Sequence, residues 1–124
     1  MTTMLDSPAT RVRMRLREEL IAALRAALDT NPPAEGTERV ILFGSVARGD
    51  FEGTSDVDLM VVGGDGAIEG SALWQAVGHR DVDVIHWRRE AWARALAQGH
   101  PFARDIAREG VELWRAPDAP PLRP

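Results

Sequence analysis

"FGSVARGDFEGTSDVDLMVV", residues 43–62, joins two apolar runs through a glycine-rich turn and a pair of aspartates. The first run ends at this stretch and covers residues 39–43, while the second covers residues 57–62. Short apolar runs bounded by turn residues are typical of buried strands. Gly44-Ser45 therefore marks the end of one strand and the start of a helical turn, and the unit as a whole predicts a mixed α/β sheet.

The two aspartates of this stretch are one residue apart, at Asp56 and Asp58. Side chains alternate between the two faces of a strand, so these carboxylates point the same way and repel each other. A divalent cation between them relieves the repulsion, and oxygen ligands suit Mg²⁺ or Mn²⁺. A lone Asp-x-Asp is also typical of a solvated strand face, so the prediction of a metal site rests on the neighbouring residues as well.

Those neighbours predict a phosphate site. Gly44 and Gly49 let the backbone approach a ligand closely, and Ser45 offers a hydroxyl donor. Arg48 adds a fixed positive charge. Together with the acidic pair, they predict a site for a metal ion and a triphosphate.

The rest of the chain continues the alternation of strands and helices. Three- and four-residue spacing of leucines and alanines predicts a first helix, which Ser7-Pro8 or Thr10 can cap and which residues 31–33 end. The other predicted elements are helices over residues 71–77, 90–98 and 102–108 and strands over residues 81–87 and 111–114. The predicted fold is a small mixed β-sheet with helices packed on it. Leu73, Trp74 and Val77 are expected to point inward.

The domain boundaries follow from composition. Residues 1–9 are expected to form a flexible leader, residues 10–115 a single domain, and residues 116–124, with four prolines, a disordered tail. No apolar run approaches the roughly 20 residues that span a bilayer, so a cytoplasmic protein is expected. A net charge of −4 disfavours a broad nucleic-acid surface. The chain has no cysteine, lysine or tyrosine, which excludes thiolate metal sites, P-loop chemistry and tyrosine self-modification.

Gly44-Ser45 followed after ten residues by "DVDL" resembles the signature of the polymerase-β-like nucleotidyltransferase superfamily. The fuller "GSVARG…SDVDLMV" is similar to the minimal nucleotidyltransferases, which pair with HEPN partners in toxin–antitoxin modules. The element order extends the likeness over residues 10–115. One departure is Val57, where isoleucine is commoner in the family. The resemblance implies a polymerase-β-like core.

The resemblance also implies a third acidic residue on a neighbouring strand, and "RDVDVIHW" offers Asp81 and Asp83. Asp83 is favoured because it is flanked by valines within the strand, whereas Asp81 stands at the strand's start. The implied catalytic residues and metal ligands are then Asp56, Asp58 and Asp83, with two Mg²⁺ or Mn²⁺ ions and ATP as the substrate. His86 is expected to point away from Asp83, because it lies three positions further along the strand.

Three functions are compatible with these expectations. The first is an antitoxin that transfers AMP from ATP to a hydroxyl, by resemblance a tyrosine, of a HEPN toxin. The second is an antitoxin that neutralises its partner by binding alone, and the intact acidic set weighs against it. The third is a transferase acting on a small molecule such as an aminoglycoside. Enzymes of that kind, however, are expected from the resemblance to be longer chains with an added substrate domain.

Overall fold

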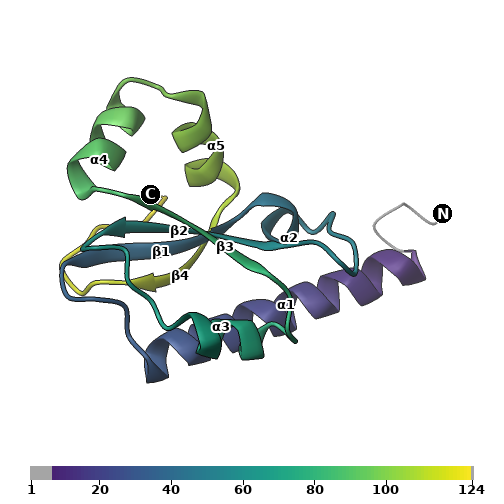
Figure 1. Cartoon of the computed structure of the whole chain (residues 1–124). Coiled ribbons are helices and arrows are strands. Elements are labelled where there is room, and N and C mark those ends of the chain that lie inside the picture. Colours follow the sequence, from purple (N-terminus) through teal and green to yellow (C-terminus); the bar gives the residue numbers. More distant parts are fainter. Residues whose placement is uncertain (1–6, 124) are drawn as a thin grey trace.

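Four strands form one sheet and five helices lie around it in the computed structural model, which describes residues 7–123 (Figure 1). The elements are, in chain order, α1 (Pro8–Thr30), β1 (Thr37–Phe43), α2 (Gly44–Arg48), β2 (Val57–Gly63), α3 (Gly70–Ala76), β3 (Val82–Trp87), α4 (Arg89–Ala97), α5 (Pro101–Glu109) and β4 (Val111–Arg115). Each predicted element is present, with its ends displaced by at most a few residues. The predicted fold class is confirmed.

The start of α1 shows the predicted cap. The Ser7 side chain accepts a hydrogen bond of 3.1 Å from the Thr10 backbone N–H, and Pro8 occupies the first turn, where its missing N–H costs nothing. Residues 7–9, which were predicted to belong to a flexible leader, instead form the cap and the first turn of α1. Residues 1–6 of the predicted leader lie outside the described residues, and the domain limits 10–115 stay a prediction. No helix within residues 7–123 is long and apolar enough to cross a membrane.

The strands lie in the order β3-β2-β1-β4. β1 pairs antiparallel with both β2 and β4, whereas β2 pairs parallel with β3. A parallel pair needs a crossover connection, and α3 is part of that connection between β2 and β3. β3 is therefore an edge strand that carries the predicted third carboxylate beside β2.

Helices cover both faces of the sheet (Figure 1). α1 and α3 lie on one face, where Leu24 and Leu73 pack against strand residues such as Leu59. α4 and α5 lie on the other face, where Trp92 and Ile106 belong to a second buried cluster with strand residues Ile41, Met60 and Val62. Because side chains alternate along a strand, Asp58 shares the second face, near α5.

The predicted inward set of α3 is correct for two of its three residues. Leu73 and Val77 are each 1% exposed, but Trp74 is 42% exposed. The Trp74 ring stacks on His79 instead, with the ring centroids 4.0 Å apart. The prediction that Trp74 points inward is wrong, because the apolar stripe of a seven-residue helix is too narrow to include it.

The proline-rich end of the chain differs from the expected disordered tail over residues 120–123. The guanidinium of Arg39 donates a 2.7 Å hydrogen bond to the Pro120 carbonyl, and Arg123 donates one of 2.7 Å to the Gly110 carbonyl. Leu122 packs against the cluster beneath α4 and α5. Partners on the body of the protein thus hold a segment that has no regular secondary structure of its own.

Arg39 is the residue on which this arrangement depends. It is 3% exposed, and it forms a 2.6 Å ion pair with Glu112 on β4. We expect Arg39→Ala to lower the free energy of unfolding by about 2–3 kcal/mol, because Glu112 loses the shorter of its two ion pairs and the Pro120 carbonyl loses its donor. Arg115→Ala is the matched control: its ion pair with Glu112 is longer, at 3.6 Å, and more exposed, so a loss below about 1 kcal/mol is expected. Urea unfolding of the two variants compares these losses, and equal effects would contradict a structural role for Arg39.

Candidate active site at the end of β1 and the starts of β2 and β3

The turn after β1 is shaped by two glycines in the left-handed region. Gly44, the first residue of α2, has φ of 78°, and Gly49, which directly follows α2, has φ of 86°. The Gly49 N–H donates a 2.9 Å hydrogen bond to the Ser45 carbonyl and so ends the helix after little more than one turn. A Cβ atom on Gly44 would collide with Oδ2 of Asp58. Glycine is therefore needed at position 44 both for its φ angle and for the close approach of Asp58.

The predicted carboxylates lie on adjacent strands. Asp58 on β2 pairs in register with Asp83 on β3, so both side chains point to the face covered by α4 and α5. Asp56 lies immediately before β2 and is exposed, while Asp58 is half-buried. The Asp81 carbonyl accepts a 2.8 Å hydrogen bond from the Val57 N–H, which places Asp81 just before β3.

Electrostatics in this cluster favour protonation of two of the carboxyls. A hydrogen bond with Asp83, then the charge of Asp83 and a small desolvation, raise the pKa of Asp56. Burial raises the pKa of Asp58 most, and the charges of Asp83 and Asp56 add to it. The Arg48 guanidinium lowers the pKa of Asp58, but it does not outweigh the other causes. The site therefore has more negative charge than its own cation neutralises.

This donor set has the chemistry that a hard divalent cation requires. Three carboxylates provide oxygen ligands only, as Mg²⁺ prefers. Within residues 7–123, however, no three acidic or histidine side chains are already arranged as a metal site. Asp83 instead raises the pKa of Asp56, through hydrogen bonding and through its charge. A cation placed among the three carboxylates would relieve the repulsion that raises the pKa of Asp56 and of Asp58.

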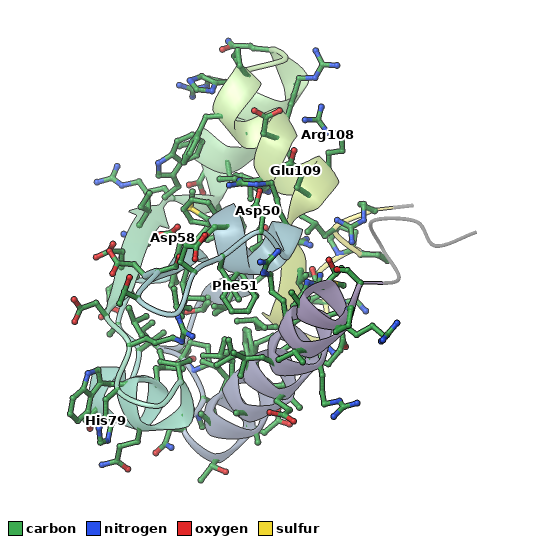
Figure 2. The ribbon with its side chains drawn as sticks, turned by 90° about the vertical axis from the view of Figure 1, so that its right-hand side faces the viewer. Asp50, Phe51, Asp58, His79, Arg108 and Glu109 are labelled. Carbon is green, nitrogen blue, oxygen red and sulfur yellow. The ribbon has the colours of Figure 1, made fainter. Side chains whose placement is uncertain are left out.

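Arg48 lies beside the carboxylates at the end of α2. Its side chain is 45% exposed, with Nε 3.1 Å from Oδ2 of Asp50 and Nη1 3.9 Å from Oε2 of Glu109 on α5. Figure 2 shows Asp50, Asp58 and Glu109 on the same part of the molecule, around α2. An arginine held at such a point offers several N–H donors to phosphate oxygens.

A pocket of about 230 Å³ adjoins this arginine between α2 and α5. Its wall is aromatic, because Phe43 and Phe102 meet edge to face with their ring centroids 5.8 Å apart. Gly44, Arg48 and Glu109 also line it. A larger hollow of about 450 Å³, between α1 and residues 51–53, contains none of the predicted site residues. The smaller pocket thus adjoins Gly44 and Arg48 of the predicted phosphate site, although none of the three carboxylates lines it.

The structure brings most of the predicted residues together. Gly44 lies against the Asp58 carboxylate, the charge of Arg48 lowers the pKa of Asp58, and Asp83 raises the pKa of Asp56. Ser45 lies half-buried in α2, next to Gly44. His86 points to the other face, where its Nε2 atom lies 3.1 Å from the Gly63 carbonyl oxygen, as expected.

Two partners of Arg48 were not predicted from the sequence. Asp50 is close in sequence, and its place two residues after the arginine was an available signal. Glu109 lies on α5, and no sequence pattern connects it to the turn at Gly44. Phe102 was likewise not expected to line a pocket beside the site.

Comparison with known proteins assigns the class of this chain. The nucleotidyltransferase domain family matches residues 21–99, which is more than half of the chain and includes α2 and all three carboxylates. The chain therefore belongs to the nucleotidyltransferase domain family. A search of the curated proteins found no match.

Two solved structures are similar to this one over much of their length. A candidate nucleotidyltransferase from Sulfolobus solfataricus has a TM-score of 0.47 and 20% identity, with 94% of this chain and 96% of that chain covered. A toxin–antitoxin structure with AMP-PNP has a TM-score of 0.47 and 21% identity, with 78% of this chain and 74% of that chain covered. At this level of similarity, no conclusion about function rests on either.

Proposed function

We propose that this nucleotidyltransferase transfers AMP from ATP to a hydroxyl group of a partner protein, and that it acts as the antitoxin of a HEPN-type toxin in the cytoplasm. The observation that carries the proposal is the pairing of Asp58 with Asp83 beside the Gly44-Ser45 turn, with Arg48 next to them. The resemblance of "GSVARG…SDVDLMV" to the minimal nucleotidyltransferases supports the choice of partner. No tyrosine occurs among the 124 residues, so a tyrosine acceptor is not one of them.

Each residue has a defined task in this reaction. Ser45 and Arg48 bind oxygens of the triphosphate, and Gly44 lets the phosphates approach the backbone. Asp56, Asp58 and Asp83 would hold Mg²⁺ or Mn²⁺, which supplies charge stabilisation at the phosphoryl oxygens when bound. Asp83 accepts the proton of the attacking hydroxyl. The hydroxyl oxygen bonds to the α-phosphorus, the bond from that phosphorus to the bridging oxygen breaks, and pyrophosphate leaves.

The experiment that tests the proposal uses the protein encoded beside this one. That protein is incubated with this chain, ATP and Mg²⁺, and its intact mass is measured. A gain in whole AMP units that is lost with the Asp56→Ala, Asp58→Ala double variant is the expected result. If the two proteins bind and the variant neutralises the partner as well as the parent does, the protein is an antitoxin that acts by binding alone.

Arg48 gives a separate prediction about the nucleotide. Arg48→Ala is expected to weaken ATP binding about tenfold, because it removes a charged hydrogen-bond donor to phosphate worth about 1.5 kcal/mol or more. Arg108→Ala is the matched control, since Arg108 is 67% exposed and forms ion pairs with Asp105 and Glu109 but not with the three aspartates of the site. Isothermal titration with a non-hydrolysable ATP analogue measures both, and an unchanged affinity in Arg48→Ala would remove Arg48 from the site.

A further inference from the structure

The outer edge of β3 is open. β3 is the last strand of the sheet on that side, and its pairing with β2 runs without a bulge from Val82 to Trp87. Val84 is 42% exposed and Ile85 is 36% exposed, although their side chains point to opposite faces. In the described part of the chain, no backbone hydrogen bond joins this outer edge to another segment.

The backbone groups on this edge can be assigned by alternation. The Asp81 carbonyl bonds to the Val57 N–H at 2.8 Å, so the backbone of residue 81 faces β2. Successive residues of a strand direct their N–H and C=O groups to alternate sides. The groups of Val82, Val84 and His86 therefore point outward, and those of Asp83 and Ile85 point to β2.

Edge strands usually carry features that block further pairing, such as proline, lysine or a bulge. β3 has none of these between Val82 and Trp87. Its one charged side chain is Asp83, which the proposed mechanism already uses. An unblocked edge therefore runs directly past the residue that would accept the proton.

We propose that the acceptor protein presents its hydroxyl in an extended segment that adds to β3 as an antiparallel strand. This inference rests on the proposed function. An added strand would form hydrogen-bonded pairs at Val82, Val84 and His86, so the residue opposite Asp83 lies in a non-hydrogen-bonded pair. The Cα atoms of such a pair are about 4.5 Å apart, and both side chains point to the same face. A tyrosine, serine or threonine at that position directs its hydroxyl to Asp83 on the face that holds Asp58.

The charges around β3 define the chemistry of the segment further. Asp81 and Asp83 lie at the beginning of the strand, while Arg88 follows its end and is exposed. Because the added strand runs in the opposite direction, the residues that approach Arg88 precede the hydroxyl residue in sequence. The complementary segment has acidic residues there, an apolar residue opposite Ile85, and then the hydroxyl residue. The bonds made and broken are those of the proposed AMP transfer, with the hydroxyl proton passing to Asp83.

Val84→Pro tests the pairing without touching the carboxylates. Proline at position 84 removes an N–H that points outward, and proline is tolerated at such edge positions because the ladder to β2 does not use that group. Val84→Thr is the matched control, since it keeps the N–H and the β-branched shape. The probe is a synthetic peptide with one tyrosine, an apolar residue two positions before it and glutamates towards its amino end. A peptide of scrambled order serves as the second control.

The expected result is that Val84→Pro lowers kcat/KM for AMP transfer to the peptide at least tenfold, whereas Val84→Thr does not. Affinity for a non-hydrolysable ATP analogue is expected to stay within twofold in both variants. Equal transfer by Val84→Pro and the parent overturns strand pairing but leaves AMP transfer intact. If no acceptor is modified by the parent, including the partner protein, the proposed function itself fails.

If Val84→Pro does not fold, amide hydrogen exchange on the unmodified chain tests whether the peptide pairs with β3. With the peptide and the ATP analogue present, the N–H groups of Val82, Val84 and His86 are expected to become at least tenfold more protected. Absence of any added protection overturns the proposal. Protection that is already present without peptide, in a chain that elutes as a dimer, also overturns it, because a second copy then occupies the edge.

Discussion

Asp58→Asn is expected to lower the rate of AMP transfer roughly a thousandfold, which is about 4 kcal/mol of transition-state stabilisation. Asp58 lies beside Gly44 and opposite Asp83, so it is the carboxylate between the Gly44-Ser45 turn and the strand proposed to receive the acceptor. Asparagine keeps the shape but removes the negative charge that a divalent cation requires. The measurement is pyrophosphate release with the acceptor protein present.

The control for this prediction is Asp29→Asn, at an exposed position of α1 far along the chain from the cluster. It removes the same charge from the protein without touching the site, and an unchanged rate is expected. Comparable losses in both variants would contradict a specific role for Asp58.

Asp58→Asn is expected to stabilise the fold, although it is expected to lower activity. Burial and the charges of Asp83 and Asp56 raise the pKa of Asp58 above its usual value of 3.8. A raised pKa means that the fold favours the protonated form: the stabilising contribution is complete below the usual value and is lost as pH rises through the raised one. Asp58→Asn is therefore expected to raise the Tm of the metal-free chain at neutral pH by a few degrees, and this gain is expected to shrink towards pH 4. A lower Tm at neutral pH would show that the loss of activity comes from a damaged fold.

Gly44→Ala is the second substitution with a large expected effect. The φ angle of 78° is strained for any residue with a Cβ atom, at a cost of about 1–2 kcal/mol. In addition, the new methyl group would overlap Oδ2 of Asp58, so the carboxylate has to move. We expect AMP transfer to fall by roughly a hundredfold or more, because a displacement of about 1 Å in a catalytic group is enough for such a loss.

Gly53→Ala is the matched control for the turn. Gly53 has an ordinary φ angle, and nothing lies within 4 Å of the position that its Cβ atom would occupy. Activity and Tm are expected to stay near those of the parent. Steady-state kinetics on both variants shows whether the loss is specific to position 44. Full activity in Gly44→Ala would contradict the proposed geometry of the site.

Much of the site could be predicted because strand alternation is a local property. Asp56 and Asp58 share a face for that reason, and the flanking valines of Asp83 indicated a position within a strand. The pairing of Asp58 with Asp83 needed the crossover through α3, which predicted elements alone do not place. The effect of Asp83 on the pKa of Asp56 depends on side-chain positions that no spacing rule gives.

The parts that could not be predicted depend on contacts between distant segments. Glu109 approaches Arg48 only because α5 packs over the end of β1. Arg39 is buried because β4 and the segment around Pro120 supply its partners, although Arg39 itself stands at the start of an apolar run. Proline content alone predicts disorder for the segment at Pro120, but it cannot show that the Pro120 carbonyl accepts a hydrogen bond from Arg39.

We propose that the turn at Gly44 and the three carboxylates form one metal and triphosphate site. Crystals grown with Mn²⁺ and a non-hydrolysable ATP analogue test it most directly, through the anomalous scattering of manganese. Manganese peaks are expected among Asp56, Asp58 and Asp83, with the phosphates at Ser45 and Arg48. Manganese bound elsewhere, or a nucleotide away from this turn, would contradict it.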